Sequence, residues 1–191
     1  MTDLHLLGPH ANNLPAPFAS FVGRERQLEE LDRLLTVHRL VTLTGAPGVG
    51  KTCLGVQLAN QLSIRYADGI WMVELAALDE PTLVASATAR VLGVREADRT
   101  PTDALVQDLR DCELLLVLDN CEHVLDACAD LAEILLTGCP GVRVLATSRQ
   151  PLGLTGEIAW RVPSLSLPEP PRPAPGHPAT LRHRHRTAPR P

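Results

Sequence analysis

One eight-residue stretch of this sequence has the residue types and spacing to bind phosphate. Residues 45–52 read GAPGVGKT and fit the pattern G-x-x-x-x-G-K-[ST]. Lys51, within this pattern, is the single lysine among 191 residues, and the other strongly basic side chains are all arginine. A compact ammonium fits between two phosphates, whereas a planar guanidinium is too wide. The retained lysine therefore favours a phosphate site over the alternative, a Gly-Pro turn with a solvated lysine.

The chemistry of such a loop indicates a nucleotide with a metal ion. Its glycines turn backbone N–H groups toward the phosphates, and the following helix adds its positive amino end. The hydroxyl of Thr52 would bind Mg²⁺. We therefore expect ATP or ADP with Mg²⁺ as ligands, and we expect the side chain of Lys51 to be solvated when no nucleotide is bound.

A second group of candidate residues follows two apolar runs further along the chain. Residues 113–118 read ELLLVL and end in Asp119, the usual position of the carboxylate that holds the water shell of Mg²⁺. Arg149 follows the next apolar run, where it would sense the γ-phosphate; the alternative is a surface arginine. Asn120 stands where many P-loop ATPases carry the carboxylate that activates water, and Glu122 is the nearest downstream acid. We therefore expect slow hydrolysis at most.

The elements that must position these residues can be read from apolar spacing. Short apolar runs predict strands and apolar residues three or four positions apart predict helices. Strands are expected at 40–44, 70–73, 113–118, 142–146 and 158–162, and helices from residue 24, over 54–62, 83–92 and 102–110, and from 124 to 138. This alternation predicts an α/β fold with a doubly wound, mainly parallel five-stranded sheet and flanking helices. Ligands of such sheets bind outside the carboxyl ends of the strands, where Lys51, Asp119 and Arg149 fall.

Composition and charge narrow the function classes. The chain is 45% hydrophobic and 21% charged with a net charge of −4, and residues 168–191 carry five arginines against one acid. The remaining body is acidic, which argues against contact between that body and nucleic acid. No apolar run is long enough for a membrane span, and residues 1–17 lack the basic start and the apolar stretch of a secretory leader, so a cytoplasmic location is expected. The five cysteines contain no C-x-x-C pair and are expected to be small core residues.

Four stretches in order and spacing resemble the NB-ARC, or AP-ATPase, division of the STAND signal-transduction ATPases, as found in large bacterial transcriptional regulators. They are FVGRE at 21–25, GAPGVGKT, LLLVLDNCEH at 114–123 and ATSR at 146–149, and the resemblance covers about residues 12–167. It implies that Thr52 and Asp119 serve the metal and that Arg149 is the sensor arginine. It also places Val22, Gly23 and Arg24 near the adenine, and it assigns the phosphates to Gly45, Ala46, Pro47, Gly48, Val49, Gly50, Lys51, Thr52 and Cys53.

The same resemblance and the composition predict the domain organisation. We expect an N-terminal linker over 1–20 and an NB-ARC-like nucleotide-binding domain over 21–167. Residues 168–191, rich in proline and arginine, are expected to be disordered. They are interpreted either as a polybasic interaction arm or as the product of a GC-rich gene read out of frame. Family members continue into a helical and a winged-helix domain, which we do not expect in this chain.

Three functions are compatible with these patterns. The first is an ATP/ADP–Mg²⁺-binding module of a signal-transduction regulatory ATPase, a weak ATPase if active at all. The second is a small-molecule phosphotransferase, and the third is a non-catalytic truncated interaction fragment. The expected partners are the nucleotide and, through the family's ATPase domain, other proteins or further copies of the chain.

Overall fold

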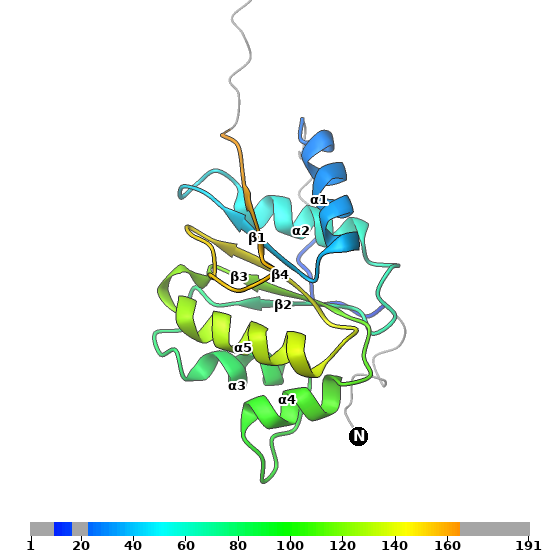
Figure 1. Cartoon of the computed structure of the whole chain (residues 1–191), viewed down its shortest axis with the longest axis vertical. Coiled ribbons are helices and arrows are strands. Elements are labelled where there is room, and N and C mark those ends of the chain that lie inside the picture. Colours follow the sequence, from blue (N-terminus) through cyan, green and yellow to red (C-terminus); the bar gives the residue numbers. More distant parts are fainter. Residues whose placement is uncertain (1–9, 17–22, 165–191) are drawn as a thin grey trace, which may run out of the picture.

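The computed structural model describes residues 10–16 and 23–164, which form a parallel five-stranded sheet with helices on both faces (Figure 1). The strand order is β2-β3-β4-β1-β5, and all neighbouring strands are parallel. The strands are β1 (Leu40–Thr44), β2 (Ile70–Glu74), β3 (Leu115–Asp119), β4 (Arg143–Ser148) and β5 (Ile158–Arg161). The helices are α1 (Glu25–Val37), α2 (Lys51–Gln61), α3 (Leu83–Val91), α4 (Pro101–Leu109), the short 3₁₀ helix η2 (Cys121–His123) and α5 (Leu125–Gly138).

The sheet separates two apolar cores because successive strand side chains point to opposite faces. In β3, Leu115 and Val117 pack with α1 and α2, whereas Leu116 and Leu118 pack with α3, α4 and α5. Every residue of β3 is buried, as expected of a central strand covered on both faces. Figure 1 shows α1 and α2 on one side of the sheet and the other three α-helices on the opposite side.

The five predicted strands and the doubly wound arrangement are confirmed, with small shifts at the element ends. β3 begins at Leu115 and includes Asp119, and β4 continues through Ser148. Asp119, Thr147 and Ser148 are therefore the last residues of strands and do not belong to the loops that follow. The candidate site therefore stands on rigid backbone.

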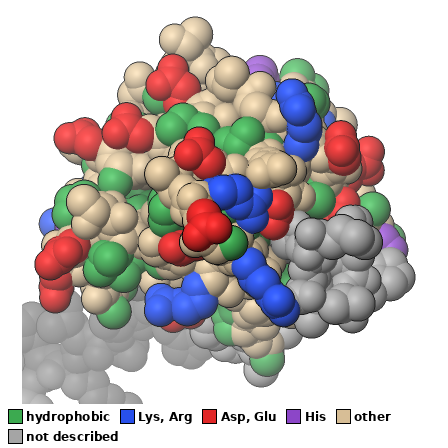
Figure 2. All heavy atoms as spheres, turned by 90° about the horizontal axis from the view of Figure 1, so that it is seen from below, with side chains coloured by type: hydrophobic (Ala, Val, Ile, Leu, Met, Phe, Trp, Pro, Cys, Tyr) green, Lys and Arg blue, Asp and Glu red, His purple; other side chains and the backbone are tan. Residues whose placement is uncertain are grey.

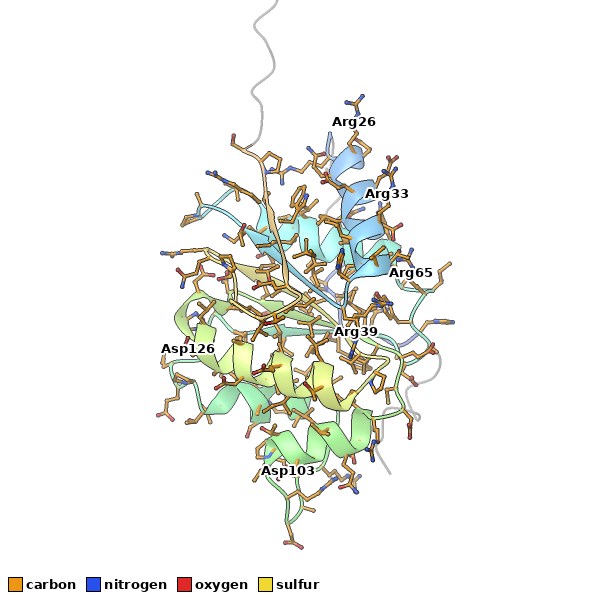
Figure 3. All side chains as sticks on the ribbon, in the orientation of Figure 1. Arg26, Arg33, Arg39, Arg65, Asp103 and Asp126 are labelled. Atoms are coloured by element: carbon orange, nitrogen blue, oxygen red, sulfur yellow. The ribbon has the colours of Figure 1, made fainter. Side chains whose placement is uncertain are left out.

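Arg39 lies just before β1, at the end of the sheet opposite the phosphate loop (Figure 3). Its guanidinium donates to the carbonyls of Leu136, Cys139 and Val142, at the end of α5 and the start of the turn into β4. Burial and the neighbouring Arg143 lower the pKa of Arg39 from its ordinary value. A cation at a helix carboxyl end satisfies carbonyls that lack partners within the helix. This contact fixes where β4 begins.

Four of the five cysteines are buried free thiols, and Cys53 is half-buried. Burial raises the pKa of Cys112 to about 11, and a hydrogen bond with Cys128 raises that of Cys121. Cys139 is also buried and its pKa is raised for the same reason, desolvation. The prediction of core residues is confirmed for the four buried cysteines, which all lie in the apolar core, but not for Cys53.

Part of the segment predicted as an N-terminal linker pairs with the sheet. Asn12 forms a parallel bridge with Ile70 at the outer edge of β2. The side-chain amide of Asn13 accepts from the Met72 N–H at 2.7 Å and donates to the Met72 carbonyl at 2.8 Å. These contacts cover an edge strand that would otherwise offer free backbone groups. Residues 10–13 therefore differ from the predicted linker, whereas residues 1–9 and the predicted disordered tail at 168–191 lie outside the described residues.

No helix within residues 10–16 and 23–164 is long and apolar enough to cross a bilayer. The face that carries α4, seen in Figure 2, has basic side chains lying among acidic ones rather than in one continuous basic field.

The edge contacts of Asn13 yield a stability prediction. Asn13→Ala removes both hydrogen bonds to Met72, so the free energy of unfolding should fall by about 1 to 2 kcal/mol. Chemical denaturation measures the change. Asn12→Ala, which loses only a 3.3 Å contact to the Leu14 N–H, serves as the control and should change less. Equal losses in the two variants would contradict a specific role for the Asn13 amide.

Candidate functional site

The phosphate loop joins β1 to α2 and takes its shape from glycines. Gly48 and Gly50 have φ angles of 79° and 86°, in the left-handed region that other residues rarely adopt. Gly50 is also the residue that precedes the first turn of α2, and no side chain caps that helix. The free N–H groups at the start of α2 and the exposed residues 46–48 therefore present an open anion site.

Lys51 does not have the solvated side chain that the sequence led us to expect. Its side chain is 7% exposed, and Nζ donates to the carbonyls of Gly45 at 3.0 Å and Ala46 at 3.3 Å. That expectation is wrong because the loop folds back over the start of α2 and offers two carbonyls within reach. The ammonium is thereby held beside the loop in a position from which phosphate oxygens could replace the carbonyls.

The two residues predicted to serve the metal are in direct contact. The Thr52 hydroxyl donates to Oδ1 of Asp119 at 2.8 Å, although the residues lie on α2 and β3. Asp119 is 7% exposed, and a buried carboxylate requires such donors. A hydroxyl beside a carboxylate suits Mg²⁺, which takes one or two protein oxygens and completes its shell with phosphate and water. The described residues contain no cluster of three or more His, Cys, Asp or Glu side chains that could enclose a metal without a nucleotide.

Asp119 has a second hydroxyl partner that the sequence analysis did not identify. The Thr147 hydroxyl, at the end of β4, donates to the same Oδ1 at 2.6 Å and accepts from the Asn120 N–H at 3.0 Å. Thr147 belongs to the ATSR stretch, so its position was visible. Its role was not, because it depends on β3 and β4 being neighbours in the sheet.

The predicted catalytic residues Glu122 and Arg149 lie together. Arg149 Nε donates to Glu122 Oε1 at 3.1 Å, and the other carboxylate oxygen of Glu122 is buried without a hydrogen-bond partner. The Arg149 side chain is 62% exposed, so it can move. Asn120 has a left-handed backbone, with φ 65° and ψ 50°, which asparagine tolerates better than most residues. The Glu122 carboxylate is thus engaged with a cation in this state.

His123 is another positioning residue that the sequence analysis missed. Its Nε2 lies 2.9 Å from the Leu75 carbonyl, directly after β2. The Leu75 N–H in turn donates to the carbonyl of Asp119 at 3.0 Å. The turn that follows Asp119 is therefore tied to β2 on one side and to β4 on the other.

Arg24 connects the start of α1 with the phosphate loop and with the chain after β5. Its Nη2 donates to the Val49 carbonyl at 2.9 Å and to the Pro163 carbonyl at 3.2 Å. The residue is 6% exposed, and its Nη1 is buried without a partner. A Cβ built on Gly50 would lie 3.8 Å from that nitrogen. The orphaned guanidinium nitrogen beside the loop fits an anionic ligand.

Of the two other residues predicted near the adenine, only Gly23 lies within the described residues. Gly23 has a φ of 87°, and its N–H donates to Glu25 at 3.3 Å. Val22 lies outside the described residues. Cys53 is half-buried in the first turn of α2.

Two hollows of about 360 and 460 Å³ lie away from this cluster. The smaller one is lined by Arg65, Tyr66 and Arg143, and the larger one lies between the edge of β2 and α3. Figure 3 shows Arg65 and Arg39 toward the same end of the sheet. Neither hollow is lined by a residue of the phosphate loop, so neither coincides with the converging side chains of the candidate site.

The fold and the site together define a P-loop nucleotide-binding domain. A family model described as an AAA domain matches residues 34–148, a span that contains the phosphate loop and Asp119. The chain therefore belongs to the AAA domain family of P-loop ATPases.

Relatives of the chain include two proteins of Mycobacterium tuberculosis. The chain is 43% identical over 149 residues to an uncharacterized protein, a match that covers 78% of this chain and 38% of the relative. It is 48% identical over 135 residues to a protein named as a candidate HTH-type transcriptional regulator, a match that covers 70% of this chain and 15% of the relative. The chain thus spans well under half the length of either relative.

Two solved structures share the fold. Cdc6p from Pyrobaculum aerophilum matches with a TM-score of 0.55 and 21% identity, over 76% of this chain and 47% of the other. A STAND protein with a tetratricopeptide repeat sensor from Pyrococcus horikoshii matches with a TM-score of 0.54 and 17% identity, over 78% of this chain and 24% of the other. At these identities the likeness concerns the fold alone, and it confirms the predicted P-loop sheet.

The contacts of Arg24 predict a role in stability. Arg24→Ala leaves the Val49 and Pro163 carbonyls without their donor, and charge-assisted hydrogen bonds contribute about 1.5 to 3 kcal/mol each. We expect the free energy of unfolding to fall by about 2 to 4 kcal/mol, as measured by chemical denaturation. Arg24→Lys should lose about half as much, since one ammonium cannot reproduce the forked donor. Wild-type stability in Arg24→Ala would show that these bonds contribute nothing net.

Proposed function

We propose that this chain is the ATP/ADP–Mg²⁺-binding module of a signal-transduction regulatory ATPase of the NB-ARC division, with slow ATP hydrolysis at most. The observation that carries the proposal is the convergence of Lys51, Thr52 and Asp119 at one end of the sheet. Lys51 and the start of α2 would bind the phosphates, and Thr52 with Asp119 would hold Mg²⁺ and its water. The ion would offset the charge between the β- and γ-phosphates.

The regulatory part of the proposal rests on the relatives. One of them is named as a candidate HTH-type transcriptional regulator, and the matched region occupies only a small part of it. A regulator of this kind would act in the cytoplasm and pass the nucleotide state to other domains, other proteins or further copies of itself. Such signalling requires two states with different contacts.

Nucleotide titration tests the proposal directly. Calorimetry with ATP and with ADP, each with and without Mg²⁺, should show binding that Mg²⁺ strengthens. Lys51→Ala should weaken ATP binding by about tenfold to a hundredfold, since it removes charge-assisted bonds to phosphate. Lys51→Arg is the matched control for charge and should also bind weakly, because the guanidinium is too wide for the loop. An unchanged dissociation constant in both variants would refute the phosphate site.

Arg149 should distinguish ATP from ADP. To reach a γ-phosphate, its guanidinium must leave Glu122, and ADP offers no group to draw it away. Arg149→Ala should therefore weaken ATP binding by about threefold to tenfold and change ADP binding by less than about twofold. Glu122→Gln removes the competing charge and should strengthen ATP binding slightly. Equal losses for ATP and ADP in Arg149→Ala would rule out the sensor role.

Hydrolysis should be slow because the position after the metal aspartate cannot accept a proton. Asn120 is neutral, and the nearest acid, Glu122, is bound to Arg149. We expect a turnover far below the ~10 s⁻¹ median for enzymes. Asn120→Asp should raise it, since aspartate also tolerates the left-handed backbone. A wild-type turnover of several per second that persists in Glu122→Gln and vanishes in Asn120→Ala would instead make Asn120 the residue that positions water.

A further inference from the structure

Thr147 lies between Asp119, the carboxylate of the proposed metal site, and Arg149, the proposed sensor arginine. It lies on β4, between β3 and β1, and is paired with Leu43 of β1. Its side chain is 1% exposed. The next residue but one along the chain is Arg149, so a shift of Thr147 would be transmitted to the sensor arginine.

The hydroxyl of Thr147 is hydrogen-bonded to two groups at the end of β3, the Asp119 carboxylate and the Asn120 N–H. Its proton is donated to Asp119 Oδ1 at 2.6 Å, and its oxygen accepts from the Asn120 N–H at 3.0 Å. Both bonds use the hydroxyl in a fixed orientation, because one proton can point in only one direction. Thr147 therefore sets the rotamer of the Asp119 carboxylate and the start of the left-handed turn at Asn120.

Thr52 and Thr147 donate to the same oxygen of Asp119, but they would not remain equivalent when a nucleotide binds. Thr52 belongs to the phosphate loop and would turn its oxygen toward Mg²⁺. Thr147 is on a sheet strand and has no such second task. Of the two hydroxyls, it is the one that would hold Asp119 while the metal is bound.

We infer that Thr147 is a positioning residue that aligns Asp119 for Mg²⁺-nucleotide, so that its hydroxyl sets how strongly Mg²⁺ enhances nucleotide binding. This inference rests on the proposed nucleotide-binding function. It adds a residue from β4 to the metal site, which otherwise comes from α2 and β3. Thr147 acts through Asp119 and touches neither the phosphates nor the metal itself.

The chain offers a matched control for the loss of a buried threonine hydroxyl. Thr42 on β1 is completely buried, and its hydroxyl has no hydrogen-bond partner. It pairs with Ala146, next to Thr147 in sequence. Thr42→Val therefore makes the same chemical change in the same sheet without touching Asp119 or Asn120.

The experiment compares Thr147→Val, Thr147→Ser and Thr42→Val with the wild type. Calorimetry gives the dissociation constant of ATP with Mg²⁺ and with EDTA, and the ratio of the two constants measures the enhancement by Mg²⁺. We expect this ratio to fall by about tenfold in Thr147→Val, with the value in EDTA unchanged within about twofold. Thr147→Ser should restore the ratio, and Thr42→Val should not alter it. Thermal midpoints record any change in folding, and Thr147→Ala replaces Thr147→Val if the valine variant does not fold.

The outcomes separate this inference from the proposed function. A wild-type ratio in Thr147→Val, or a fall that Thr147→Ser does not restore, would overturn the positioning role while nucleotide binding stands. Equal weakening in Mg²⁺ and in EDTA would also overturn it, because the effect would then be structural. A wild-type protein that binds ATP in neither buffer would overturn the proposed function and this inference together.

Discussion

The hydrogen bonding of one buried carboxylate holds the site together. Asp119 is 7% exposed at the end of a strand that is buried along its whole length, and an ionised group in such a place must be paired or hydrogen-bonded. Its Oδ1 accepts from hydroxyls of α2 and β4, which are separated from it by 67 and 28 residues. Both interactions require the start of α2 and the carboxyl ends of β3 and β4 to meet at the same end of the sheet. The parallel order β3-β4-β1 produces this arrangement, since α2 follows directly from β1 through the phosphate loop.

Much of the fold follows from local sequence patterns. The apolar run before Asp119 predicts a strand covered on both faces, and the phosphate-loop pattern predicts a strand followed by a loop and a helix. These features depend on residues close in sequence, and the structure confirms them. The order of the strands could not be predicted from the same patterns, because it is decided by packing between distant segments. Thr147 illustrates the consequence: its place at a strand end was evident, but its bond to Asp119 depends on which strand lies beside it.

The differences from prediction concern polar groups that find partners within the fold. Lys51 was expected in water, but the folded loop offers two carbonyls within 3.3 Å. Residues 10–13 were expected to form part of a linker, but the edge of β2 presents backbone groups that Asn13 can satisfy. In both cases the sequence shows a polar residue, and only the three-dimensional structure shows which orphaned backbone groups are nearby. Hydrogen-bond satisfaction is therefore the part of this structure that sequence patterns describe least well.

The two cations of the candidate site are held in unequal ways, and this bears on how nucleotide could change the domain. Lys51 rests on neutral carbonyls, which phosphate oxygens can replace with a gain in charge pairing. Arg149 rests on a carboxylate, so a γ-phosphate must compete with an existing ion pair and gains less. Either nucleotide in the loop would thus favour movement of the Lys51 ammonium from the carbonyls to phosphate oxygens. Movement of the Arg149 guanidinium from Glu122 would depend on the third phosphate. Under the proposed function, the Glu122–Arg149 pair would be the element that changes its arrangement, and its release would free the end of β4 and the η2 turn for new contacts when ATP binds.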